Sequence, residues 1–122
     1  MTLSNQLKEA KFICLETYKR SGEPVRTPVW FTVENGLIYF HTSSKSGKVK
    51  RLRRNPSVRV APCSRFGRIT GDWFKGEALM VEGEESKRLV ELINSRLGLI
   101  DKIISLFHRK NRIVFRIRLE DC

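Results

Sequence analysis

The sequence predicts a mainly β protein of the α+β class, a small six-stranded antiparallel β-barrel with helical insertions. Its 122 residues are enough for one hydrophobic core and too few for two ordinary domains, so residues 1–122 form a single predicted domain. Hydrophobic residues make up 40% of the chain and charged residues 30%, which is typical of a globular protein. Six short β-prone segments are separated by turn signals or helical patterns, and this order of elements is typical of a small barrel.

A meander of three strands opens the barrel, after a short helix over Thr2–Lys8. The turns between these strands contain Gly22 and the dipeptide Asn35-Gly36, where positive φ is easily adopted. Tight turns between consecutive strands make their pairing antiparallel. The three strands are predicted over Lys11–Tyr18, Val25–Val33 and Leu37–Thr42.

Pro28 lies inside the second of these predicted strands. A proline has no backbone N–H for a neighbouring strand, so it belongs at a sheet edge, at a bulge, or where strand pairing gives way to something else. Two interpretations stay open: an edge proline without a ligand, or a strand against whose backbone a ligand lies.

The turn after the third strand leads into a basic helix. Residues 42–48 combine four hydroxyl side chains, two lysines and Gly47, and the helix ends before Pro56, because a residue preceding proline is pushed out of the α region. Backbone N–H groups at a helix N-terminus attract anions, and Lys48 adds a full positive charge. The turn therefore predicts a phosphate site, although a Ser/Lys-rich turn before a basic helix is also typical of a solvated surface.

The second half of the chain adds three strands and two helices. Gly76, inside the fifth strand, predicts a bulge or a close approach of another backbone segment. Apolar residues recur every three or four positions in helices over Glu84–Leu97 and Leu99–Phe107. The strands are predicted over Ser57–Cys63, Asp72–Glu82 and Asn111–Leu119, and the buried stripe of the last helix over Ile100, Ile103, Ile104 and Phe107.

The net charge of +11 indicates an anionic partner. No acidic residue occurs between Glu34 and Asp72, whereas lysines and arginines are frequent there. Such a field attracts nucleic acid, anionic lipid, or a phosphorylated or polycarboxylate small molecule. The basic helix contains no aromatic residue on which bases could stack, so nucleic-acid binding is the weaker interpretation.

The sequence shows no pattern that is typical of a membrane span, a signal peptide or a metal site. No apolar run approaches the roughly 20 residues that cross a bilayer. The N-terminus lacks the basic-then-apolar layout of a signal peptide, so we expect a cytoplasmic protein without membrane association. Three cysteines and two histidines show no metal-ligand spacing, and no metal is expected.

Four motifs occur in a characteristic order: Thr27-Pro-Val-Trp-Phe31, Ser46-Gly-Lys-Val-Lys-Arg-Leu52, Val60-Ala-Pro-Cys63 and Gly71-Asp-Trp-Phe-Lys-Gly-Glu-Ala78. From about Phe12 to Ile117 the chain resembles the pyridoxamine 5′-phosphate oxidase-like FMN-binding split-barrel superfamily. More narrowly, it resembles the class of coenzyme F420-dependent oxidoreductases.

The resemblance implies a homodimer with two cofactor grooves between split barrels. It implies that the strand over Thr27–Phe31 passes beside a flavin or deazaflavin ring, and that the Ser/Lys turn and basic helix hold the cofactor phosphate. By position, it implies contacts to the ring from the strand residues Thr27, Pro28, Val29 and Trp30, and contacts to the phosphate from Thr42, Ser43, Ser44, Ser46 and Lys48. It also implies that Lys50 and Arg51 reach the phosphate or the tail beyond it, and that the partner subunit's Trp73 closes the groove.

The charge distribution bears on the choice between the two cofactors. FMN carries one phosphate, whereas F420 adds an oligoglutamate tail with several further carboxylates. The basic stretch from Lys45 to Arg68 is more than one phosphate requires, which favours F420 over FMN. The alternative is that these side chains face solvent, where lone charges contribute little.

The leading functional hypothesis is a flavin- or deazaflavin-dependent oxidoreductase. It would transfer a hydride between bound F420 or FMN and a small unsaturated or quinone-like substrate, with the chemistry supplied by the cofactor. His41, beside the turn, is a candidate proton donor. The alternatives are a non-catalytic F420/FMN-binding or carrier module and a basic nucleic-acid-binding barrel. The chain ends soon after its last strand, so pyridoxamine phosphate oxidation itself is not expected.

Overall fold

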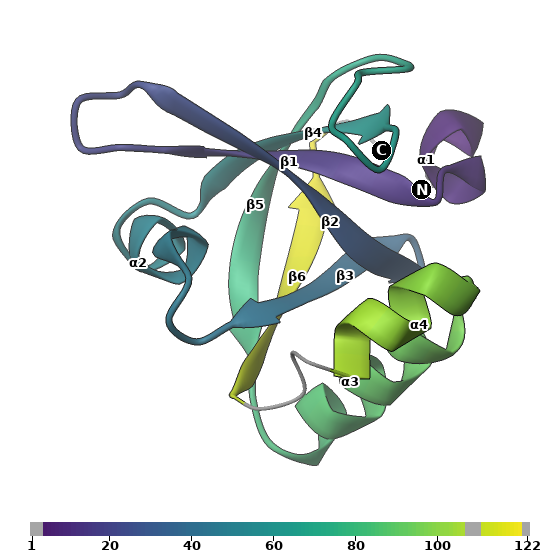
Figure 1. Cartoon of the computed structure of the whole chain (residues 1–122). Coiled ribbons are helices and arrows are strands. Elements are labelled where there is room, and N and C mark those ends of the chain that lie inside the picture. Colours follow the sequence, from purple (N-terminus) through teal and green to yellow (C-terminus); the bar gives the residue numbers. More distant parts are fainter. Residues whose placement is uncertain (1–3, 107–110, 121–122) are drawn as a thin grey trace.

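Six strands close into an antiparallel barrel in the order β1-β2-β3-β6-β5-β4 (Figure 1), in a computed structural model that describes residues 4–106 and 111–120. The predicted fold class is confirmed. The strands are β1 (Phe12–Tyr18), β2 (Pro24–Glu34), β3 (Leu37–Ser43), β4 (Ser57–Cys63), β5 (Phe74–Val81) and β6 (Arg112–Leu119). The helices are α1 (Asn5–Glu9), α2 (Gly47–Arg54), α3 (Glu84–Ser95) and α4 (Leu99–Leu106).

The interior of the barrel holds the main hydrophobic core. Phe40 of β3 and Phe115 of β6 stack there with their ring centroids 5.5 Å apart. Helix α3 covers part of the outer surface, where its Leu89 and Ile93 pack on Tyr39 and Val114. Because of this cover, Val114 is fully buried although it lies on the outer face of β6, where Arg116 is half-buried and Arg118 is exposed.

Local sequence signals set the ends of the elements that matter for the site. The Ser46 hydroxyl accepts a hydrogen bond from the Lys48 N–H at 3.2 Å and so caps α2, which ends just before Pro56 as predicted. Asn35 and Gly36 both adopt positive φ in the β2–β3 hairpin. At Gly76, a Cβ atom would lie 2.6 Å from the Arg118 carbonyl oxygen, which confirms the predicted close approach.

Helix α4 differs from its sequence-based prediction. Ile100, Ile103 and Ile104 are 63%, 51% and 40% exposed, although all three were expected on a buried stripe. The reason is Asp101, whose carboxylate is buried in an ion pair with Arg65 and turns a different side of the helix inward.

Phe107 and the start of the predicted first helix, Thr2, lie outside the described residues. No helix within 4–106 or 111–120 is long and apolar enough to cross a membrane.

A buried carboxylate ties three neighbouring strands together on the outer surface. Glu16 of β1 is 1% exposed and accepts hydrogen bonds from Arg26 Nε at 2.7 Å, Arg59 Nε at 2.6 Å and the Tyr18 hydroxyl at 2.7 Å. The bond from Arg59, with those from Tyr18 and Arg26, holds the pKa of Glu16 at about 2, below its usual value near 4.5. Since the folded state binds this proton less readily than the unfolded chain, the interaction stabilises the fold above pH 4.5 and is lost as the pH falls toward 2.

We predict that Glu16→Gln lowers the free energy of unfolding at pH 7 by about 3 kcal/mol, since 2.5 pKa units correspond to roughly that amount. The variant should also lose the decrease in stability between about pH 4.5 and pH 2. Urea unfolding followed by circular dichroism at several pH values measures both effects. Glu23→Gln removes an exposed carboxylate paired with Lys19 and serves as the control. Equal losses in the two variants would contradict the role of Glu16.

Candidate functional site

The candidate site lies where β2 and β3 separate. The two strands pair only from Phe31 opposite Phe40 to Glu34 opposite Leu37, next to the hairpin turn. Continuing that register would place Trp30 opposite His41 and Val29 opposite Thr42, but these residues are not paired. β2 stays paired with β1 over its first part, and β3 stays paired with β6, so a gap opens between β2 and β3 on one side of the barrel.

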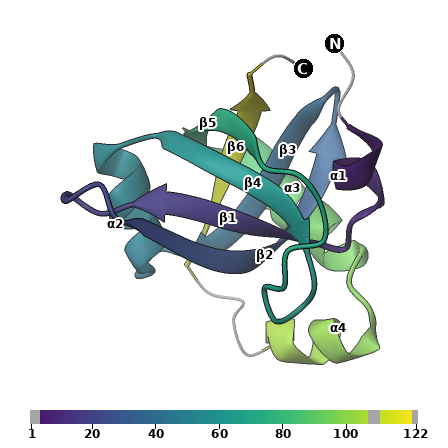
Figure 2. The same ribbon diagram turned by 90° about the horizontal axis from the view of Figure 1, so that it is seen from above.

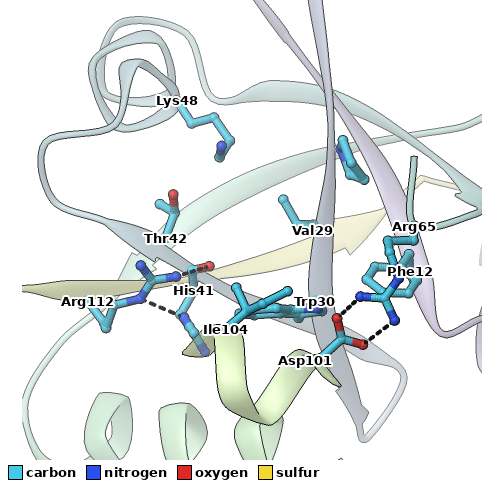
Figure 3. Close-up of a pocket in the computed structure, with 11 residues that line it drawn as sticks. Phe12, Val29, Trp30, His41, Thr42, Lys48, Arg65, Asp101, Ile104 and Arg112 are labelled. Atoms are coloured by element: carbon cyan, nitrogen blue, oxygen red, sulfur yellow. Dashed lines mark hydrogen bonds and ion pairs between the residues drawn. The ribbon is translucent and has the colours of Figure 1, made fainter. Parts of the chain in front are cut away.

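A cavity of about 280 Å³ occupies this gap (Figure 3). Its walls come from six elements and one loop, so it is a product of the tertiary fold. The cavity is lined by Phe12, Pro28, Val29, Trp30, His41, Thr42, Lys48, Arg65, Asp101, Ile104 and Arg112.

The backbone of β2 contributes to this wall because of Pro28. In an antiparallel ladder, alternate residues direct their backbone polar groups to opposite neighbours. Pro28 stands opposite Cys14 of β1. Because Pro28 has no N–H, it suits a position that exchanges no hydrogen bonds with β1. At such a position the alternation directs the Pro28 carbonyl away from β1 and toward the gap. Trp30, two residues on, directs its N–H and carbonyl the same way. The gap therefore offers one donor and two acceptors to a flat heterocycle lying along β2.

One end of the cavity is cationic. In Figure 3, Lys48 reaches down from α2 toward Thr42, whose hydroxyl points back at it, and Arg112 enters from β6. No carboxylate within the described residues forms an ion pair with Lys48 or Arg112, and Asp101 lies at the other end of the cavity. Burial, together with the charges of Arg51 and Arg112, lowers the pKa of Lys48. Two half-buried cations and a hydroxyl facing one space are a donor set suited to an anion such as a phosphate.

His41 fixes the position of Arg112. Arg112 donates from Nε to His41 Nδ1 at 2.9 Å and from Nη2 to the His41 carbonyl oxygen at 3.4 Å. Since Nδ1 accepts, Nε2 carries the ring proton and donates to Asn94 Oδ1 of α3 at 2.9 Å. Burial and the charge on Arg112 lower the pKa of His41 to about 4. The ring is therefore neutral near pH 7, and it has no free N–H to give to a substrate.

The opposite end of the cavity is closed by an ion pair. Arg65, from the loop after β4, forms a two-pronged ion pair with Asp101 of α4 (Figure 3). The Arg65 guanidinium also lies over the Phe12 ring, 5.4 Å from its centroid. Ile104 of α4 covers the space between this pair and His41. A loop and a helix outside the barrel thus form the cover of the cavity.

The structure brings part of the predicted set together. Inside the cavity are Pro28, Val29, Trp30, His41, Thr42 and Lys48. Outside it are Thr27, Ser43, Ser44, Ser46, Lys50, Arg51 and Trp73.

Several of the outside residues have another role. Ser46 caps α2, and Arg51 Nε donates to Thr17 Oγ1 at 2.7 Å, behind the helix. Lys50 points into solvent. Trp73, which was expected to close the groove of the partner subunit, packs within its own subunit against Arg26 and Arg59, whose guanidinium carbons are 4.8 and 4.9 Å from its ring centroid.

The remaining three lie near the ends of β2 and β3. The Thr27 hydroxyl is buried, and no hydrogen-bond partner for it is found among the described residues. Ser43 Oγ accepts from the Lys45 N–H at 3.3 Å, and Ser44 is exposed.

Sequence reasoning missed five residues that line the cavity: Phe12, Arg65, Asp101, Ile104 and Arg112. Arg112 carried a usable signal, because it opens the last alternating strand and its basic neighbours suggested an anion. The other four meet only through the fold.

A family model described as pyridoxamine 5′-phosphate oxidase matches residues 2–122, nearly the whole chain. The chain belongs to this family. No protein among those with curated descriptions matches it in sequence.

Solved structures of the same fold carry different descriptions. The chain is similar to a heme storage protein from Vibrio cholerae (22% identity, TM-score 0.72, 100% of this chain and 93% of that one). It is also similar to a conserved hypothetical protein from Mycobacterium tuberculosis (25% identity, TM-score 0.71, 95% and 77%). A third similar structure is an F420 reductase (16% identity, TM-score 0.64, 98% and 94%). At these identities the likeness concerns the fold, and the ligand has to be argued from the cavity.

The donor groups in the described part of the chain bear on two kinds of ligand, a metal ion held by several side chains and an iron atom ligated by a histidine. No group of three His, Cys, Asp or Glu side chains there is arranged to hold a metal ion. Both ring nitrogens of His41 are engaged, so His41 is unsuited to ligating an iron atom.

We predict that Asn94→Asp raises the pKa of His41 by about 1–3 units, because a carboxylate at Nε2 favours the charged ring. A protonated ring cannot accept from Arg112, so affinity for inorganic phosphate should fall below the new pKa. NMR titration of the imidazole nitrogens in a His108→Gln background measures the first effect, and phosphate titration the second. Asn94→Leu, which adds no charge, should leave the ring neutral at pH 7. A wild-type His41 that titrates near pH 6.5 would contradict the arrangement.

Proposed function

We propose that this protein is a flavin- or deazaflavin-dependent oxidoreductase that binds FMN or coenzyme F420 in the cavity between β2 and β3. It would transfer a hydride between that cofactor and a small unsaturated or quinone-like substrate. The observation that carries the proposal is that one cavity contains both a cationic end and a strand edge without a pairing partner. Lys48 and Arg112 form the cationic end, and the backbone of Pro28 and Trp30 forms the strand edge.

The residues present fit such a cofactor. Lys48, Thr42 and Arg112 would hold its phosphate, and the backbone of Pro28–Trp30 would face its ring. When bound, the cofactor supplies the hydride chemistry. His41 orients Arg112 and carries no proton to a substrate, since its pKa is about 4 and both nitrogens are engaged.

The side chains around the ring position control access of water. Phe12 and Ile104 are apolar, and the Arg65–Asp101 pair closes the cavity beside them. Exclusion of water strengthens the electrostatic interactions inside a site and protects a reduced cofactor from side reactions.

The structure does not strengthen the charge argument for F420 over FMN. Lys48 and Arg65 are the cations of the stretch from Lys45 to Arg68 that line the cavity. Arg59 is paired with Glu16. Lys45, Lys50, Arg53, Arg54 and Arg68 are exposed and lie outside the cavity. We therefore propose FMN or F420 without preference, to be decided by titration.

We predict that Lys48→Gln weakens binding of FMN and of F420 by roughly 10- to 100-fold, since a hydrogen bond to a charged group contributes about 1.5–3 kcal/mol. Fluorescence titration of the cofactor-free protein measures this. Lys50→Gln, on the same helix and with the same loss of charge, should bind as the wild type does. Because the pKa of Lys48 is lowered, wild-type affinity should decrease at alkaline pH earlier than for an ordinary lysine, and Lys48→Gln should lack this decrease. Absence of binding of either cofactor would refute the proposal.

We also propose that the protein is a homodimer in which a second copy covers the outer side of α4. Leu99, Ile100 and Ile103 are 78%, 63% and 51% exposed, and Phe66, on the loop that carries Arg65, is 90% exposed. Figure 2 shows α4 beside this loop, and both contribute residues to the wall of the first cavity. Apolar side chains gathered in this way are typical of an association surface.

We predict that Ile103→Glu shifts the protein from dimer to monomer in sedimentation equilibrium, because a charge buried without a partner opposes association. The control is Leu79→Glu, which replaces an apolar residue of similar exposure on β5 and should leave the dimer intact. A wild type that stays monomeric at high micromolar concentration contradicts the dimer. Dissociation by Leu79→Glu alone places the interface elsewhere.

A further inference from the structure

A second cavity of about 400 Å³ adjoins the first. The two cavities share four lining residues, Phe12, Trp30, Arg65 and Asp101, so they meet at the Arg65–Asp101 ion pair and at the indole ring. The other walls come from the α1–β1 connection, the α3–α4 connection and Phe31 of β2. Figures 1 and 2 both place α1 and α4 on the same side of the barrel, away from α2 and the cationic end of the first cavity.

One part of the wall of the second cavity suits a flat, apolar body. Three aromatic side chains line it, those of Phe12, Trp30 and Phe31, together with the aliphatic Ala10 and Leu97. Aromatic side chains interact favourably with flat ring systems by stacked or edge-to-face contacts. Charged side chains also line the cavity and can fix the orientation of a ligand; they are those of Glu9, Lys11, Arg65, Arg96 and Asp101.

The charged groups of this cavity leave an excess of positive charge. Arg65 and Asp101 neutralise each other. Of the remaining three, Lys11 and Arg96 are cations and Glu9 is an anion, and no ion pair in the described part of the chain joins Glu9 to either cation.

Arg96 is held in place without being neutralised. Its Nη1 donates to the Phe31 carbonyl oxygen at 3.2 Å, and its guanidinium carbon lies 5.7 Å from the centroid of the Phe31 ring. Because a guanidinium has five N–H donors, this single bond leaves donors for a ligand carboxylate.

We propose that the second cavity binds a planar unsaturated or aromatic acid, with its ring body against Trp30 and Phe12 and its anionic group at Arg96 and Lys11. That such an acid is the substrate rests on the proposed function, because the shared wall at Trp30 then places the acid beside the cofactor ring. The cavity itself and its charges do not depend on that function.

The test compares 2-naphthoate with 2-naphthamide, two probes of the same shape that differ in charge. Calorimetry on the wild-type protein should show at least fivefold tighter binding of 2-naphthoate. Backbone amide shifts in the NMR spectrum should change at Leu97 and Gly98, which line the second cavity. Arg96→Gln should remove the preference for the charged probe, and Lys11→Gln should reduce it. Lys8→Gln, which removes an exposed charge from nearby α1, should change nothing.

Three outcomes would overturn the inference: equal affinity for the two probes, an undiminished preference in both Arg96→Gln and Lys11→Gln, or binding that is lost in Lys48→Gln instead. The last result would place the probe at the cationic end of the first cavity. In the wild type, addition of saturating FMN or F420 should leave 2-naphthoate binding in place.

Failure of the proposed function gives a different result. If neither FMN nor F420 binds while 2-naphthoate still shows the Arg96-dependent preference, the acid site stands and the cofactor is wrong. If the cofactor binds and the preference is absent, the cofactor site stands and the acid site is wrong.

Discussion

The site depends on one backbone constraint, the missing N–H of Pro28. β2 is paired with β1 over Pro24–Trp30, so its second edge must face something there. β3 pairs with that edge only at Phe31 and beyond, toward the hairpin turn. A proline in the unpaired part costs no ladder bond on the gap side, since nothing pairs with it there. The sheet thus stays closed around the core while one strand edge remains open to a ligand.

The chemistry of this gap follows from what surrounds it. Taking cations out of water without a carboxylate partner opposes folding, and the lowered pKa values of Lys48 and Arg112 reflect that cost. The neutral His41 reduces it, because the ring accepts a hydrogen bond from Arg112 without adding a third charge. Glu16 shows the opposite arrangement on the same barrel, where two arginines meet a buried carboxylate and stabilise the fold. Cations left without such a partner are available to an anionic ligand.

The sequence indicated the residues whose role is local. Lys48 follows a recognisable helix cap, and Pro28 lacks a donor wherever the strand lies, so both could be selected as candidate site residues before the fold was known, and both line the cavity. Arg65 and Asp101 are 36 positions apart and meet only because a loop and α4 lie over the same opening. The sequence could not show that both ring nitrogens of His41 have partners, because Asn94 and Arg112 come from α3 and β6. Periodicity alone also misjudged α4, where the ion pair at Asp101 decides which side of the helix faces inward.

The two cavities adjoin each other, and their charges are unevenly spread. Lys48 and Arg112 lie at one end, Arg96 and Lys11 lie at the other, and the Arg65–Asp101 pair lies between them. An anionic group at the centre would have to compete with Asp101 for Arg65 and would be repelled by that carboxylate at short range. Anionic groups are therefore favoured at the two ends, and uncharged rings in the middle beside Trp30. One long ligand with a single charged end would leave the other cations without a partner, so this distribution favours two ligands that meet at the indole ring.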